Sequence, residues 1–263
     1  NAMPGTLAQG LIWGIMAIGL YITFRVLNLS DLTVDGSICT GGAVCVMLML
    51  AGWPAPAAMA AAFVAGMLTG LVTGLLHTFM GIPAILAGIL TQLSLYSINL
   101  KIMGKANQAL SVRNYDLLVS LNYVKKPILE NTIFIVAIVV AVLIAVLYWF
   151  FGTEMGCGIR ATGDNLNMVF GLVISNGIVA LAGSLLVQYQ GFCDVQMGRG
   201  AIVIGLAAVI IGEALFGKIL PNNFALKLMA VGLGGVVYYV VYQTVILMGL
   251  DPDLLKMLSA VVV

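Results

Sequence analysis

The chain has 263 residues, of which 62% are hydrophobic and only 8% charged, and its mean hydropathy is +1.14. An ordinary soluble domain is about a quarter charged, so this composition excludes that class and indicates an integral membrane protein. Eleven basic and ten acidic residues give a net charge of +1, which excludes the basic signature of a nucleic-acid-binding protein. Asn1 and Ala2, ahead of Met3, are expected to be a tag remnant, and residues 3–263 a single membrane domain.

The apolar runs are long enough to cross a membrane as helices, because about 20 helical residues span roughly 30 Å of hydrocarbon. They lack the alternation of barrel strands, and lipid offers the backbone no hydrogen-bonding partner, so an all-α polytopic fold is expected. About eight transmembrane or half-membrane helices are predicted. In chain order they cover residues 6–24, 37–50, 55–77, 81–100, 131–151, 168–187, 201–216 and 224–248.

Polar residues precede the second run, which is too short to cross comfortably alone. Among them are Asp31 and Asp35, just ahead of Gly36. Irregular backbone survives at depth only where it is shielded or lines a cavity, which suggests a transport pathway. The alternative is that these carboxylates cap a helix at the membrane surface. The third run carries Gly66, Gly70 and Gly74, whose spacing predicts a stripe for close helix packing.

Two longer polar segments give conflicting signals about orientation. Residues 101–129 carry five basic residues and one acidic residue before Leu129, and the positive-inside rule places such a segment in the cytoplasm. A single span separates it from the glycine-broken island at 152–165, which would then lie outside.

Three charged residues in the second half have two interpretations each. Arg199 lies between two glycines, and Asp194 offers it a partner of opposite charge; the pair either meets a polar or zwitterionic solute or ties the loop to itself. Glu213 lies near the end of an apolar run, where a carboxylate is costly. It has either a structural role, with solvent or Lys218 relieving the cost, or a role in the pathway or in conformational change.

No metal, nucleotide or catalytic site is predicted on this chain. The four cysteines lack zinc-ligand spacing, and the single histidine, His77, leaves few nitrogen ligands for a metal. The cysteines are therefore interpreted as small packing residues. Residues 212–218 match the glycine and lysine spacing of a phosphate-binding loop, but Ile219 replaces the required Ser or Thr and no strand precedes it. No set of nucleophile, base and acid is present, so the chain is not expected to be an enzyme.

Residues 158–165, GIRATGDN, resemble the cytoplasmic loop of the permease subunits of ABC importers, in the family that serves branched-chain amino acids, ribose and related sugars, and nucleosides. Residues 31–37, DLTVDGS, and 205–213, GLAAVIIGE, are similar to an early polar motif and a late helix of the same family, in the same order. The greatest similarity is to bacterial permeases labelled uncharacterised or tryptophan-type amino-acid systems.

The resemblance implies a multi-pass protein of the bacterial inner membrane, paired with a second permease copy or homologue. It further implies ATPase subunits that bind the ATP, and an extracytoplasmic solute-binding protein. By position, the residues expected at the ATPase-coupling surface are Arg160, Gly163, Asp164 and Asn165. Those expected near the pathway or its outer mouth are Asp35, Asp194 and Arg199.

The chain departs from the family pattern after Met168, where a further polar segment is expected but an apolar run begins at once. We interpret this as an omitted coupling segment near 168–169, whose basic residues would place 152–168 inside and 101–129 outside. A stand-alone secondary transporter or channel is the alternative function, and a structural scaffold is a third. A partner ATPase would discriminate among them, and amino acid, sugar and nucleoside remain open as substrates.

Overall fold

The computed structural model describes residues 3–111, 115–125, 131–161, 166–217 and 223–248. Within these ranges, six helices are long and apolar enough to cross a membrane, and two shorter apolar helices accompany them. The long ones are α1 (Met3–Tyr21) with its π-helical end η1 (Ile22–Val26), α3 (Ala55–Thr78), α4 (Ala84–Met103), α5 (Thr132–Phe151), α7 (Leu166–Gln190) and α9 (Phe224–Leu247); the shorter ones are α2 (Val34–Leu50) and α8 (Ala201–Phe216). The predicted all-α polytopic fold is confirmed.

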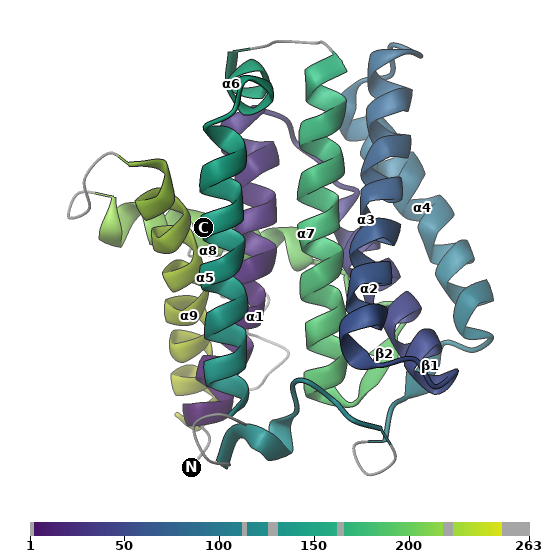
Figure 1. Cartoon of the computed structure of the whole chain (residues 1–263), viewed down its shortest axis with the longest axis vertical. Coiled ribbons are helices and arrows are strands. Elements are labelled where there is room, and N and C mark those ends of the chain that lie inside the picture. Colours follow the sequence, from purple (N-terminus) through teal and green to yellow (C-terminus); the bar gives the residue numbers. More distant parts are fainter. Residues whose placement is uncertain (1–2, 112–114, 126–130, 162–165, 218–222, 249–263) are drawn as a thin grey trace.

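Helix α7 lies at the centre of the bundle, between α1 on one side and α2 and α3 on the other (Figure 1). Within their most apolar windows, 78% of the residues of α1 and α7 are buried, against 17% for α5. Helices α8 and α9 pack with α1 on one flank, and α4 packs with α2 and α3 on the other. Because α7 contacts helices of both flanks, it holds the two halves of the molecule together.

The predicted glycine stripe of α3 lies directly against α7. A Cβ atom at Gly66 would overlap Asn176, and one at Gly70 would overlap the backbone oxygen of Leu172. At Gly74 a Cβ would lie 2.8 Å from Val169 Cγ1. The two backbones therefore approach as closely as the absence of side chains permits.

The two polar segments lie at opposite ends of the bundle. The start of α1, strands β1 (Asn107–Ala109) and β2 (Phe192–Asp194) and the 3-10 helix η2 (Leu121–Lys125) lie at the lower end in Figure 1, and α6 (Glu154–Ala161) lies at the upper end. The strands pair antiparallel, with Asn107 opposite Asp194. The assignment of the α6 end to the cytoplasm stays a prediction.

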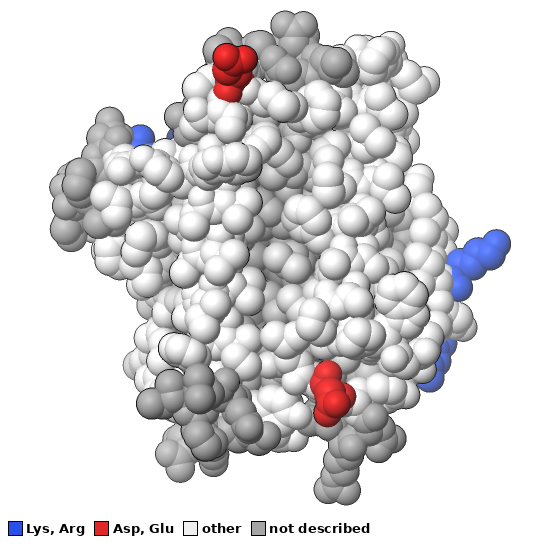
Figure 2. Space-filling view, in the orientation of Figure 1, with Lys and Arg blue, Asp and Glu red and all other residues white. Residues whose placement is uncertain are grey.

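Charged side chains avoid the middle of the molecule on the face shown in Figure 2. Their atoms appear at the two ends and along the edges, and the broad centre is uncharged. This distribution suits a protein whose middle lies in the hydrocarbon layer of a membrane.

Candidate functional site: a polar cavity where two short helices meet

Asp35 joins the beginnings of the two short helices. It lies in the first turn of α2, yet its Oδ2 accepts a hydrogen bond from the Gly200 N–H (3.1 Å) and its Oδ1 accepts one from the Ile202 N–H (2.9 Å). Gly200 is the N-cap of α8 and has φ of +79°, a conformation that glycine adopts without strain. A Cβ at Gly198 would overlap the backbone oxygen of Asp35. The carboxylate therefore caps a helix distant in sequence, with its oxygens half-buried at the junction.

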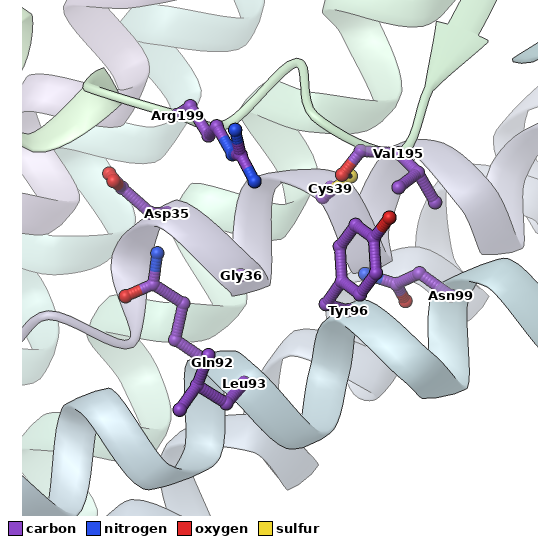
Figure 3. Close-up of a pocket in the computed structure, with 9 residues that line it drawn as sticks. All are labelled: Asp35, Gly36, Cys39, Gln92, Leu93, Tyr96, Asn99, Val195 and Arg199. Atoms are coloured by element: carbon purple, nitrogen blue, oxygen red, sulfur yellow. Dashed lines mark hydrogen bonds between the residues drawn. The ribbon is translucent and has the colours of Figure 1, made fainter. Parts of the chain in front are cut away.

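A cavity of about 340 Å³ lies beside this junction, between α2, α4 and the segment 195–200. Figure 3 shows Asp35, Gln92 and Arg199 toward one end, Asn99 and Val195 toward the other, and Tyr96 between them. The residues that line it are Asp35, Gly36, Cys39, Gln92, Leu93, Tyr96, Asn99, Val195 and Arg199. Its wall thus combines opposite charges, neutral amides and apolar surface.

Arg199 is exposed, and its side chain makes no ion pair or hydrogen bond with any residue that the structure describes. Asp194 forms no ion pair with Arg199; its Oδ1 instead accepts a hydrogen bond from the Gln196 N–H at 2.7 Å. The guanidinium points into the cavity (Figure 3). Of the three residues predicted near the pathway, Asp35 and Arg199 line the cavity, whereas Asp194 lies at the end of β2 and does not.

Asn99 was not identified from the sequence. Its side chain is 1% exposed, and neither Nδ2 nor Oδ1 has a hydrogen-bond partner within the described part of the chain. A signal was available, because Gln92 and Asn99 are seven residues apart and so lie on the same face of α4. Two amides on one face of an apolar helix indicate a polar contact.

A buried polar network holds the start of α2 behind the cavity. Asp31 is 2% exposed, and its Oδ2 accepts a hydrogen bond from Asn176 Nδ2 at 2.7 Å. Ser37 donates to Asn176 Oδ1 at 2.6 Å and lies 2.7 Å from Thr69 Oγ1. The buried carboxylate is thereby stabilised by an amide, and α2 is bound to α3 and α7.

A second set of hydroxyls extends the network to α4. Thr33 Oγ1 lies 2.7 Å from Thr73 Oγ1, and Thr73 donates to Thr91 Oγ1 at 2.9 Å. Since Thr33 immediately precedes α2 and Thr91 lies on α4, these bonds fix the two helices that form the cavity wall.

Glu213 forms an ion pair with Arg25, a partner that the sequence did not reveal. The pair connects η1 to α8, and its side chains are 48% and 32% exposed. At such exposure an ion pair contributes only about 0.2–1 kcal/mol to stability. Lys218, the partner considered from sequence, lies outside the described residues.

The predicted ATPase-coupling surface also falls outside the described part. Residues 163–165 are not described, nor is the side chain of Arg160 at the end of α6. Helix α7 begins at Leu166 and runs through the junction at 168–169 where an omitted segment was predicted. The coupling role of Arg160, Gly163, Asp164 and Asn165 therefore stays a prediction.

Comparison with known proteins identifies the family. Residues 3–263 match the family model described as branched-chain amino acid transport system / permease component. A tyrosine transport system permease protein of Clostridioides difficile (strain R20291) is 35% identical over 276 residues, covering 100% of this chain and 89% of that protein. A Rickettsia prowazekii (strain Madrid E) protein, named Uncharacterized protein RP368, is 33% identical over 283 residues, covering 100% and 95%. No solved structure gives a significant match. The chain belongs to the branched-chain amino acid transport system permease family and is a multi-pass membrane transport permease, not an enzyme.

Proposed function

We propose that this permease forms the membrane pathway of an ATP-driven importer for an amino acid, in the bacterial inner membrane. The observation that carries the proposal is a cavity lined by both Asp35 and Arg199, in which the Arg199 guanidinium is unpaired among the described residues. A site with one cation and one anion matches the ends of a zwitterion. The name of the Clostridioides difficile relative supports the same class of solute.

The two charged groups have the hydrogen-bonding capacity that a zwitterion needs. The planar fork of an arginine binds a carboxylate with two parallel hydrogen bonds. Each oxygen of Asp35 accepts one backbone N–H and retains a further lone pair for an ammonium group. Short helices that meet at such a site are typical of transporters, whose solutes bind where helices are interrupted.

The outer surface of α4 is mostly apolar. Its exposed side chains include Leu93 (65%) and Ile98 (49%), and Tyr96 is 41% exposed beside the cavity. An exposed apolar surface of this kind packs against lipid or a second protein. We infer that a second permease copy or homologue faces α4 and that the pathway runs between them.

In this proposal, a separate chain supplies the energy for transport. This sequence has no phosphate-binding loop, so an ATPase subunit would supply ATP hydrolysis at the α6 end, and a solute-binding protein would deliver the amino acid at the opposite end. Both alignments to relatives are longer than the 263 residues of this chain, which supports an omitted internal segment.

Purification of the natural protein from its own membrane in mild detergent, with mass spectrometry of bound proteins, tests the assembly. We expect an ATPase and a solute-binding protein to remain bound. The double variant Arg160→Glu with Asp164→Lys should lose the ATPase and retain the second permease copy. Recovery of the permease alone, under conditions that keep known importers assembled, would instead favour a secondary transporter or channel.

A further inference from the structure

We propose that Asn99 recognises the side chain of the transported amino acid, and that this side chain is aromatic and ends in a hydroxyl group. The inference rests on the proposed function and adds a specificity-determining residue to it. The end of the cavity farthest from Arg199 would then hold the side chain of the solute.

The unpartnered amide of Asn99 is the starting observation. Both of its polar atoms are buried and lack a partner among the described residues, and the residue lines the cavity. The great majority of buried side-chain polar atoms in proteins are hydrogen-bonded. An amide that is buried, unpaired and beside a cavity is therefore a group prepared for a ligand.

The length of the cavity fits an amino acid with a ring. Gln92 and Asn99, which mark its two ends along α4, are seven residues apart, or roughly 10 Å along a helix axis. With its charged groups bound at Asp35 and Arg199, an extended aromatic amino acid would bring the tip of its side chain to Asn99. A short aliphatic solute would leave this amide unpaired.

The walls between the two ends suit a flat apolar group. Leu93 and Val195 provide aliphatic surface, and the ring of Tyr96 lies between the charged end and Asn99 (Figure 3). Aromatic rings pack favourably against one another in offset or edge-to-face geometry. A few polar groups that converge on an otherwise apolar site fix the orientation of a ligand.

The chemistry of the amide selects the terminal group. An asparagine side chain offers an accepting oxygen and a donating nitrogen, and a hydroxyl both donates and accepts, so one hydroxyl can satisfy both. An unsubstituted phenyl ring can satisfy neither. The site should therefore favour a phenol over a phenyl side chain.

Uptake by the assembled transporter in proteoliposomes, with L-tyrosine and L-phenylalanine as probes, tests this inference. The wild type should prefer tyrosine by about ten- to a hundredfold, the range expected for two neutral hydrogen bonds. Asn99→Leu, which keeps the size of the side chain, should reduce the preference to less than about threefold. Thr244→Ala, which removes an exposed hydroxyl from α9 away from the cavity, is the control and should keep the preference.

A melting curve without solute distinguishes recognition from a structural role. Asn99→Leu should melt at the wild-type temperature or higher, since it removes an unpaired buried amide. A lower melting temperature would show that Asn99 is bonded within the protein and would overturn the inference. Equal uptake of both probes by the wild type, or an unchanged preference in Asn99→Leu, would also overturn it while leaving the importer intact. Absence of uptake of either probe would count against the proposed function itself.

Discussion

Asp35 combines two tasks that ordinarily belong to different residues. Its two oxygens accept separate backbone N–H groups at the start of α8, and the same carboxylate lines the cavity. A residue that caps a helix from a distant segment also fixes the distance between the two segments. The position of Arg199, which directly precedes Gly200, therefore depends on Asp35.

We predict that Asp35→Asn lowers the free energy of unfolding by about 1–2 kcal/mol, the usual cost of losing a helix cap. An amide has one accepting oxygen, so one of the two N–H groups would face an NH₂ group instead. Thermal denaturation in detergent measures the change. Asp194→Asn is the control, because Asp194, at the end of β2, accepts one local hydrogen bond through Oδ1, from the Gln196 N–H. Equal melting temperatures for Asp35→Asn and the wild type would contradict the capping role.

At the residue scale, the charged residues that line the cavity were easier to identify from the sequence than the neutral ones. Asp35 and Arg199 were identified because a charge in an apolar chain is conspicuous. Asn99 was missed because a single amide inside an apolar run resembles a tolerated polar residue, and its burial is decided by packing. Arg25 was treated as the end of a span, because its partner Glu213 is 188 residues away.

Helix packing against α7 depends on the glycines of α3. Gly66 and Gly70 lie where any side chain would meet the backbone of α7. Because Asn176 of α7 also holds Asp31, displacement of α7 would disturb the network that positions α2. The stripe thus has a consequence for the cavity as well as for stability.

We predict that Gly70→Ala destabilises the protein by about 1–3 kcal/mol, since the added methyl forces two helices apart. This loss exceeds the gain of up to about 1 kcal/mol that alanine normally brings to a helix. Gly232→Ala in α9 is the matched control, because its Cβ would meet nothing closer than 3.7 Å and should be neutral or stabilising. Melting of the two variants side by side measures the difference; similar behaviour would show that α3 and α7 are not in close contact.

At the element scale, helices were predicted closely and the small elements were not. The predicted run 201–216 coincides with α8, and the others differ by a few residues at their ends. Length and hydropathy suffice to predict such spans, because the membrane requires about 20 apolar residues in a helix to cross it. The pairing of β1 with β2 was missed, since strands of three residues have no detectable period and join segments far apart in sequence. Helix α6 was read as part of a polar island.

In the whole molecule, the cavity lies on one flank of a bundle whose halves meet at α7. Helices α2 and α4 belong to that flank, whereas α8 packs with α1 and α9 on the other. The hydrogen bonds of Asp35 to the start of α8, beside the cavity, therefore connect the two flanks. In the importer proposed above, an ATPase at the α6 end would open or close the cavity by small relative movements of the two flanks, as alternating access requires.

The measurement that tests the central claim most directly is L-tyrosine uptake by proteoliposomes that contain the permease and its ATPase, with the solute-binding protein outside and ATP at the ATPase face. We predict accumulation that requires ATP hydrolysis and the binding protein. Arg199→Gln should reduce it about tenfold or more, because a charge-assisted hydrogen bond to the solute is lost. Accumulation by the permease alone on an ion gradient, or full-rate uptake by Arg199→Gln, would contradict an ATP-driven pathway through this cavity.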